Sequence, residues 1–445
     1  MREIAAVKTL TGNQGLSTLP ADLPRAAAGQ SGVSLVELMV TLAVGAIVVL
    51  GLTEILASTK ATYRREEAFA RLQENGRIAS MLLAKELRPS RTMPCKSLDL
   101  HQVEGTLTVK ACALLDGAGC SGEHLLQTGR PLGFDQSELS TASDFDDIPL
   151  PAEARTSLAE RYVGGDMLLA WGVEPIGVAV AGPLGDGSGE DTATGRINLA
   201  GASGLKDGEL ALISNCRSAH VFAVSNVDDS PPFVEHARAG HAGQVNAADD
   251  LYPSAGTRVY GSSGLEIPYN SRAGDPQAWL YPLVYRVFYI CCTQDNRLQT
   301  GAARDKCRPG SGSYQPDDYR PALCVYDLQR AGGRNQALVP NVADMRVTYS
   351  GHGSHAGDPL FSGEAAAALD ADAWARVRAA SLELLLTTAE TNAAAEPRAP
   401  TSTNWPPNDD SADRLGAAYP ADHRLYQRLR LDVALRPATP WLAKD

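Results

Sequence analysis

An uncharged segment near the N-terminus constrains this 445-residue chain more than any other feature. Sixteen residues without a charge lie between Glu37 and Glu54. No other stretch of the sequence is long enough and apolar enough to enter a bilayer. Placing a carboxylate in such a segment costs about 2.5–3.5 kcal/mol of membrane-insertion free energy, so Glu37 is expected to have a charge partner or a functional role.

The nonapeptide that introduces this segment is Gly32-Val33-Ser34-Leu35-Val36-Glu37-Leu38-Met39-Val40. The small residue Gly32 is a candidate processing point. A secretory signal peptide carries its apolar core before the cleavage site, whereas here the core follows Gly32. Cleavage would therefore remove residues 1–32 as a leader and leave the apolar segment attached. The alternative is a plain signal anchor.

The nonapeptide resembles the prepilin signal of type IV pilins and type II secretion pseudopilins. The resemblance implies cleavage after Gly32 by a prepilin peptidase, which also methylates the new N-terminus at Val33. Val33 replaces the usual Phe of that family, and Ser34 the usual Thr. Glu37, the fifth mature residue, would be neutralised by the N-terminal amine of a neighbouring subunit. This pairing would depend on the axial position of the subunit, since a misplaced subunit leaves a charge unpaired. A first-turn acid favoured by the helix macrodipole is the simpler interpretation of Glu37.

Residues 33–88 predict one long helix that ends before Pro89. At 1.5 Å per residue it would be on the order of 80 Å long, which exceeds a bilayer. Residues 33–56 are therefore expected in the membrane or filament core, and residues 57–88 outside it. In this second part, apolar residues recur at spacings of three and four and predict a face that packs on a folded domain: Phe69, Leu72, Gly76, Ala79 and Leu83.

The remainder of the chain, residues 89–445, predicts a β-rich globular domain. Candidate strands are residues 106–111, 166–173, 209–214, 220–225, 283–291, 323–327, 345–349, 381–387 and 429–435. Residues 365–377 predict a short helix, and residues 226–278 and 391–418 predict long loops. The expected fold class is α+β, a long N-terminal helix packed on a large antiparallel β-rich domain with long loops. The domain is expected to comprise two sub-blocks, about 89–230 and 279–445.

All eight cysteines lie beyond the apolar segment: Cys95, Cys112, Cys120, Cys216, Cys291, Cys292, Cys307 and Cys324. If the apolar segment sends that region outward, disulfides are the default expectation, although their connectivity cannot be read from the sequence. No C-x2-C pair provides the usual zinc-ligand spacing, so no metal is expected. The adjacent Cys291 and Cys292 could form a redox pair, but two structural disulfides leaving in different directions are the simpler interpretation.

Further stretches narrow the resemblance to the PilW family of minor pilins. They are residues 73–77, 212–222, 325–328, 338–345 and 429–436. This resemblance implies a minor-pilin complex with FimU, PilV and PilX-like subunits that primes type IV pilus assembly, with the major pilin and a tip adhesin as further partners. It also implies a single pass of the inner membrane with a periplasmic domain, and then a place in the cell-surface pilus.

Composition and motifs argue against two other classes of protein. The formal net charge of -12 and the pI near 5.2 argue against a broad nucleic-acid surface, because neutralising phosphates needs clustered Lys and Arg. Residues 261–264 do not form the G-x-S-x-G elbow, and no H-E-x-x-H pattern occurs, so neither an enzyme nor a cofactor is expected. The alternatives are a GspJ-like pseudopilin of type II secretion and a membrane-tethered exported adhesin or enzyme.

Overall fold

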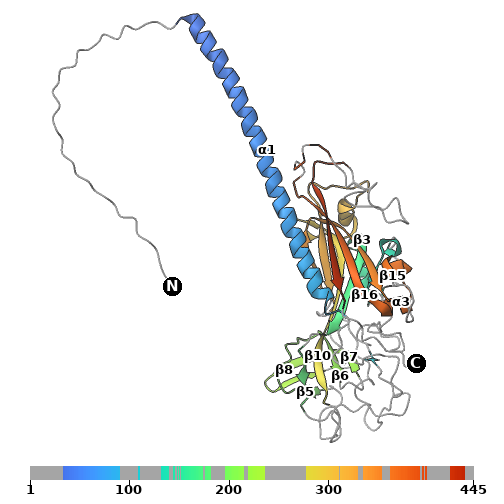
Figure 1. Ribbon diagram of the computed structural model, residues 1–445. Coiled ribbons are helices and arrows are strands. Elements are labelled where there is room, and N and C mark those ends of the chain that lie inside the picture. Colours follow the sequence, from blue (N-terminus) through green and yellow to red (C-terminus); the bar gives the residue numbers. More distant parts are fainter. Residues whose placement is uncertain are drawn as a thin grey trace, which may run out of the picture. The chain divides into compact units, whose positions relative to one another are not determined.

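A computed structural model of the chain, shown in Figure 1, describes residues 34–90, 109–110, 132–139, 144–145, 148, 150, 152–173, 176–181, 196–214, 219–235, 277–309, 311–328, 334–352, 361–390, 393–394, 396–397 and 421–435. The chain divides into two units, Met1–Lys60 and Ala61–Asp445. The first contains the apolar segment. The second contains all the strands of the described residues.

Helix α1 (Leu35–Leu87) covers nearly the whole of the predicted helix without a break. The Ser34 carbonyl accepts a hydrogen bond from the Leu38 N–H at 3.0 Å, and Ser is a residue type favoured at a helix start. In the first unit, every described side chain from Ser34 to Lys60 is exposed. The apolar segment therefore has no protein partner within that unit.

The second half of α1 buries one face in the second unit. Its buried residues recur at helical spacing: Ala68, Leu72, Gly76, Ala79, Leu83, Ala84 and Leu87. A Cβ atom on Gly76 would lie 2.8 Å from Leu386 Cδ1 and 3.3 Å from Leu429 Cδ2, so the helix backbone packs directly on the sheet there. The inclusion of Phe69 in this face was wrong. Phe69 is 45% exposed, because Ala68 occupies the inward position of that turn.

The strands of the described residues form three sheets. The ten-stranded sheet contains β1 (Val109–Lys110), β2 (Gly133–Phe134), β3 (Tyr162–Val173), β4 (Val178–Ala179), β6 (Leu210–Ser214), β7 (Ala219–Ala223), β10 (Trp279–Gln294), β11 (Arg297–Leu298), β12 (Arg320–Asp327) and β13 (Arg334–Pro340). The four-stranded sheet contains β14 (Val342–Gly351), β15 (Phe361–Ala365), β16 (Val377–Thr387) and β17 (Tyr426–Ala434). The small sheet contains β5 (Arg196–Asn198), β8 (Asn226–Asp229) and β9 (Pro232–Glu235).

Short helices connect some of these strands. They are α2 (Ala152–Ala159), α3 (Ala371–Arg376), and the 3-10 helices η2 (Gln136–Leu139), η4 (Gly301–Cys307) and η5 (Ala366–Ala368). The Asp370 carboxylate caps α3 by accepting a hydrogen bond from the Ala373 N–H at 2.7 Å. The single short helix predicted over residues 365–377 is thus two pieces, and its last residue already belongs to β16.

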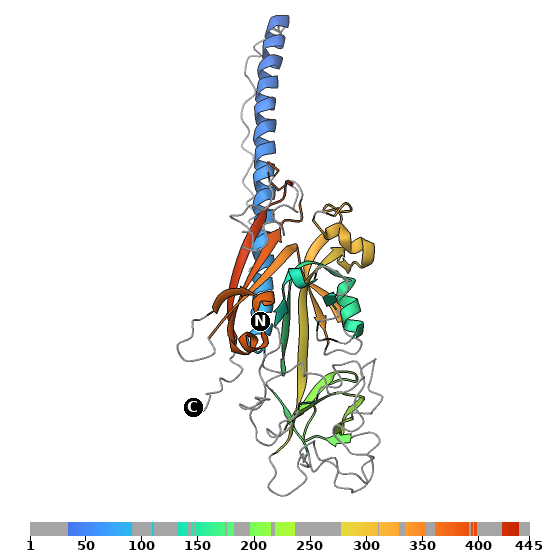
Figure 2. The same ribbon diagram turned by 90° about the vertical axis from the view of Figure 1, so that its right-hand side faces the viewer.

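Strand β10, the long yellow strand of Figure 2, contributes residues to two hydrophobic cores of the second unit. Its first residues pair with β4 and β6, and residues 283–293 pair with β3 and β12. One core lies around Ile213, Phe222, Val234 and Leu280, and the larger core includes Leu168, Phe288 and Leu384. Strands from the expected sub-blocks 89–230 and 279–445 therefore share one sheet, and β10 contributes to both cores.

The four-stranded sheet contacts the ten-stranded sheet through β3 and β14. Asp166 in β3 accepts a hydrogen bond from the Val347 N–H in β14. A Cβ on Gly165 would lie 2.5 Å from Asp344 Oδ1, and Gly165 has a φ of 78°, so only glycine suits this close approach.

The predicted fold class is confirmed: a long N-terminal helix precedes a large domain rich in antiparallel strands. Eight of the candidate strands overlap β3, β6, β7, β10, β12, β14, β16 and β17. Of the candidate 106–111, only β1 lies within the described residues. The loop predicted over residues 226–278 was wrong at its start, where β8 and β9 pair across a Pro-rich turn. Most of the loop predicted over residues 391–418 lies outside the described residues.

Candidate functional site

The expected processing point lies just before the described part of the chain. Gly32 and Val33 are outside the described residues, so their predicted roles remain predictions. Glu37 lies in the first turn of α1, where the partial positive charge of the helix N-terminus favours an acid. Both interpretations of Glu37, a first-turn acid and an assembly charge, are compatible with this position.

Hydroxyl groups in the apolar segment bond to the helix itself. Thr41 Oγ1 donates to the Leu38 carbonyl at 3.0 Å, and Thr53 Oγ1 donates to the Leu50 carbonyl at 2.7 Å. Such local bonds satisfy a hydroxyl without any partner in lipid. The carboxylates of Glu37 and Glu54 make no hydrogen bond or ion pair among the described residues.

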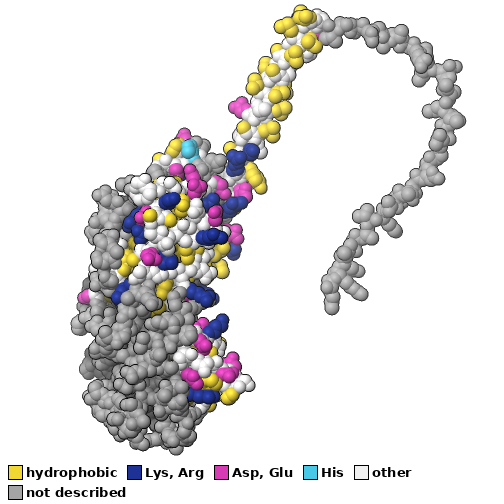
Figure 3. All heavy atoms as spheres, turned by 180° about the vertical axis from the view of Figure 1, so that it is seen from behind, with side chains coloured by type: hydrophobic (Ala, Val, Ile, Leu, Met, Phe, Trp, Pro, Cys, Tyr) yellow, Lys and Arg dark blue, Asp and Glu magenta, His cyan; other side chains and the backbone are white. Residues whose placement is uncertain are grey.

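The apolar segment has the length and composition of a membrane span. Helix α1 is the one described helix that is long and apolar enough to cross a membrane, and the side chains of its apolar part are exposed. Seventeen helical rises separate Glu37 from Glu54, which is about 25 Å and close to the ~30 Å of a hydrocarbon core. Figure 3 shows hydrophobic side chains along this part of α1. The segment fits a single-pass membrane anchor with a globular domain.

A groove of about 630 Å³ lies beside the first buried turn of α1 in the second unit. Its walls come from the β10–β11 turn, the segment before β12, the β13–β14 turn and the residues that follow β16. Two of these turns have left-handed residues, with φ of 48° at Asp295, 62° at Asn296 and 61° at Asn341. Asp and Asn tolerate this conformation better than most residues, so the local sequence favours the tight turns that form these walls.

The groove is lined by more carboxylates than cations: Glu74, Asp295, Asp317, Asp318 and Glu390 against Arg71 and Arg320. Arg71 bonds to Glu390 at 3.1 Å and to Glu67 at 2.7 Å, so it neutralises one side of the groove. Among the described residues, Glu74, Asp295 and Asp318 make no ion pair. The groove therefore retains negative charge that is open to a cationic partner.

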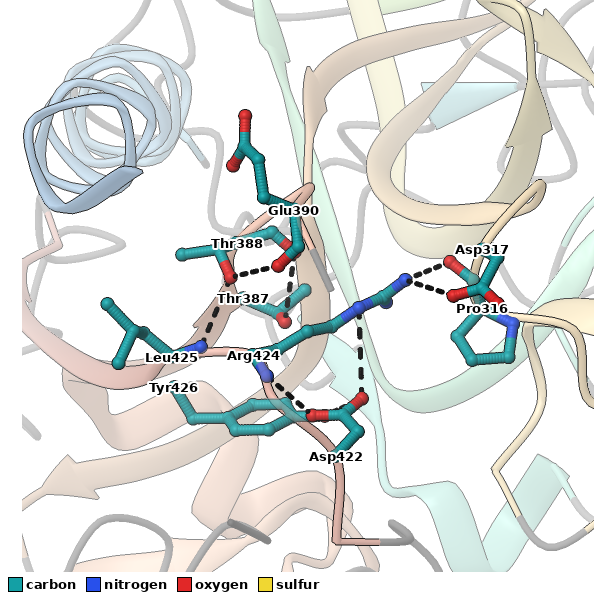
Figure 4. A network of polar contacts seen from close by, with 9 residues as sticks. All are labelled: Pro316, Asp317, Thr387, Thr388, Glu390, Asp422, Arg424, Leu425 and Tyr426. Atoms are coloured by element: carbon teal, nitrogen blue, oxygen red, sulfur yellow. Dashed lines mark hydrogen bonds and ion pairs between the residues drawn. The ribbon is translucent and has the colours of Figure 1, made fainter. Parts of the chain in front are cut away.

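A buried arginine supports one wall of this groove (Figure 4). Arg424 is 2% exposed, and its Nη2 donates to the Pro316 carbonyl, directly before Asp317. Its Nε lies 3.7 Å from Asp422 Oδ2, and its backbone N–H donates to Asp422 Oδ1 at 3.0 Å. Because burial without a partner would be costly for a guanidinium, these contacts fix the position of the 316–317 segment.

The opposite end of the same network fixes the residues after β16. The Leu425 N–H donates to Thr388 Oγ1 at 3.1 Å, and that hydroxyl donates to the Glu390 carbonyl at 3.1 Å. Thr388 is 3% exposed. The sequence pattern predicted neither this network nor the groove, because their residues lie in turns and strand ends separated by up to several hundred positions.

A second polar cluster joins the two larger sheets. Asp166 is 5% exposed and accepts hydrogen bonds from the Gln136 N–H at 2.9 Å and the Val347 N–H at 2.7 Å. Burial raises the pKa of Asp166 to about 7, and the nearby charge of Asp135 contributes to the rise. The described residues contain no group of three or more His, Cys, Asp or Glu that could hold a metal ion. The two hydrogen bonds of Asp166 join the backbone at Gln136 to the backbone at Val347.

The described cysteines form two disulfides. Cys291 bonds to Cys324 in the neighbouring strand β12, and Cys292 bonds to Cys307 at the end of η4. Successive side chains of a strand point to opposite faces, so the adjacent cysteines of β10 leave in different directions. Cys95, Cys112, Cys120 and Cys216 lie outside the described residues.

The fold and the exposed apolar helix define a protein with an N-terminal membrane anchor and a β-rich domain. The sequence matches the family model of the prokaryotic N-terminal methylation motif over residues 28–53. Together with the apolar helix, this motif supports a protein of the type IV pilin family. No curated protein and no solved structure matches the chain.

Proposed function

We propose that this protein is a PilW-like minor pilin that joins a minor-pilin complex and primes the assembly of a type IV pilus. The observation that carries the proposal is the methylation motif at residues 28–53, which ends inside an exposed apolar helix. The motif supports a function of the pilin or pseudopilin type, and it implies processing by a prepilin peptidase.

In this proposal the apolar part of α1 first anchors the precursor in the inner membrane, with the domain in the periplasm. It then moves into the core of the pilus, where packing against other helices replaces contacts with lipid. Glu37 pairs with the N-terminal amine of a neighbouring subunit, which offsets the cost of burying a carboxylate. The function is assembly rather than catalysis, and it contributes to adhesion and twitching motility at the cell surface.

The proposed partners are other minor pilins of the FimU, PilV and PilX types, the major pilin and a tip adhesin. The groove beside α1 supports a role for the domain in subunit contacts, because its acids Glu74, Asp295 and Asp318 make no ion pair among the described residues. The proposal places this subunit at the pilus tip.

A complementation experiment in the native bacterium tests this function. Deleting the gene should reduce surface pili strongly, and the wild-type chain should restore them. Glu37→Ala should fail to restore them although the protein is made and inserted, whereas Thr41→Ala, whose hydroxyl bonds within its own helix, should succeed. Normal piliation together with a loss of protein secretion would contradict the proposal and favour a GspJ-like pseudopilin of type II secretion.

A further inference from the structure

A short cationic segment, residues 60–65, lies between the apolar part of α1 and the start of its buried face. Its cations Lys60, Arg64 and Arg65 are exposed and make no ion pair among the described residues. Tyr63 is 66% exposed although it is a large aromatic side chain. The buried face of α1 begins only at Ala68. The packing of the domain therefore does not account for these four side chains.

The cationic segment follows the apolar part of α1 at the distance of lipid headgroups. The helix from Leu35 to Leu56 is about 32 Å long, which matches the ~30 Å of a hydrocarbon core. Lys60 lies about 6 Å beyond Leu56 along the helix, and Arg64 about 12 Å. The headgroup layer adds about 5–8 Å on each side of the core. Because helical side chains lean toward the N-terminus, which is here the direction of the bilayer, long Lys and Arg side chains reach back to this layer.

We propose that Lys60, Arg64 and Arg65 bind the phosphate groups of anionic lipids at the bilayer surface on the side of the domain, with Tyr63 beside them in the interface. Aromatic residues are enriched at this depth, and each cation near an anionic surface contributes about 1 kcal/mol. The bilayer is the partner that the structure favours, because α1 runs without a break from the membrane anchor into the cationic segment. This lipid contact goes beyond the proposed assembly function and rests on the anchor alone.

The acids that follow do not cancel the charge of the cationic segment. Glu67 pairs with Arg71 at 2.7 Å, one turn further from the bilayer. Glu66 remains as an exposed acid next to the segment. Three cations against one unpaired acid leave a net positive charge at the bilayer surface.

The acidic groove of the same chain is the alternative partner of Arg64, because the groove begins one turn further along α1, at Ala68. Arg64 makes no ion pair with any groove acid among the described residues. The groove already contains the cations Arg71 and Arg320. The lean of helical side chains toward the N-terminus also carries the Arg64 guanidinium away from the groove and toward the bilayer.

Photocross-linking to lipid tests the contact with the full-length chain. Benzoyl-phenylalanine replaces the exposed Tyr63, and the protein is reconstituted in nanodiscs of phosphatidylcholine and phosphatidylglycerol in equal parts. Mass spectrometry of the illuminated chain identifies the attached lipids. We expect attached phosphatidylglycerol to exceed phosphatidylcholine by about threefold or more, and high salt should reduce this ratio because it screens the cations.

Neutralising the cationic segment provides the decisive comparison. The variant Lys60→Gln, Arg64→Gln, Arg65→Gln should return the ratio of attached lipids to that of the mixture. Lipid should still become attached, because the apolar segment continues to place residue 63 beside the bilayer. The loss of preference without a loss of attachment separates the binding of headgroups from mere proximity to them.

A matched control removes three exposed cations further along the same helix: Arg77→Gln, Lys85→Gln and Arg88→Gln. Arg77 already lies about 30 Å beyond Leu56, so this variant should keep the wild-type ratio. A wild-type ratio equal to that of the mixture, a ratio that ignores the loss of the cationic segment, or attachment to the chain's own groove in place of lipid would overturn the inference. Each of these outcomes would leave the proposed assembly function intact.

Discussion

The carboxylate of Asp166 in β3 accepts a hydrogen bond from the backbone N–H of Val347 in β14, with 2.7 Å between the two atoms. The other oxygen of Asp166 accepts the N–H of Gln136. One side chain thus joins the ten-stranded sheet, the four-stranded sheet and η2. Because the pKa of Asp166 is about 7 in the folded protein, this junction is sensitive to pH.

The contribution of Asp166 to the stability of the domain should fall as the pH rises from about 4 to about 7. The folded-state pKa of Asp166 lies above its unfolded value, so the folded state binds more protons in this range. Its contribution is complete below the unfolded pKa and is lost through pH 7, with a total on the order of a few kcal/mol. Thermal unfolding of the full-length chain in detergent at several pH values measures the change.

The variant Asp166→Asn isolates this contribution. It should be less stable than wild type by about 1–3 kcal/mol, because its amide cannot accept both backbone N–H groups. It should also lose the part of the pH dependence assigned to Asp166. The exposed Asp207→Asn is the control and should keep the wild-type slope. An unchanged slope in Asp166→Asn would refute the assignment.

Gly76→Val should weaken the packing of α1 on the sheet. Its Cβ would lie 2.8 Å from Leu386 Cδ1, and the added methyl groups would need further room in a buried contact. We expect a loss of about 1–3 kcal/mol in the free energy of unfolding. Arg77→Val introduces the same side chain at the neighbouring exposed position without the contact. Helix propensity alone would make Arg77→Val the less stable variant, because Val is a poorer helix former than Arg and a better one than Gly. Equal stability of the two variants would show that Gly76 is not a close-packed position.

Arg286 is expected to stabilise the junction between α1 and β10. It forms ion pairs with Glu86 of α1 and, at 3.2 Å, with Asp327 of β12. Although burial lowers the pKa of Arg286, the two carboxylates raise it, so the guanidinium is charged. Arg286→Met should cost about 1–3 kcal/mol in chemical denaturation, since two partly buried carboxylates lose their partner. Adding Glu86→Gln and Asp327→Asn to this variant should recover part of the loss.

Replacing both Cys292 and Cys307 by Ala should lower the stability of the domain by about 3 kcal/mol, because the disulfide closes a loop with a sequence separation of 15. The separation of 33 between Cys291 and Cys324 should make the loss about 0.7 kcal/mol greater for that pair. Parallel thermal unfolding of the two double variants measures both losses. Wild-type stability in either variant would contradict a structural role for that disulfide.

The sequence predicted the fold class and most long strands because their signals are local. An uncharged run indicates the anchor, and the alternation of residues 429–435 indicates the strand that became β17. It predicted Phe69 on the buried face of α1 because spacing alone allows either Phe69 or Ala68 in that turn. The structure places Ala68 inward, at 2% exposed, and leaves Phe69 at 45% exposed.

The groove and the Asp166 junction could not be predicted, because both depend on contacts between distant positions. Arg424 contacts Pro316, more than one hundred residues earlier, and Asp166 contacts Val347. A carboxylate at the start of the predicted strand 166–173 was the one local sign of the junction. Its burial follows only from the packing of β3 on β14.

Mass spectrometry of the mature N-terminus from the native bacterium, with and without its prepilin peptidase, tests most directly whether this protein is processed as a pilin. A protein of the type IV pilin class should begin at a methylated Val33 when the peptidase is present and remain uncut when it is absent. An uncut chain in both strains, or a cut beyond the apolar segment that removes Glu37, would contradict it.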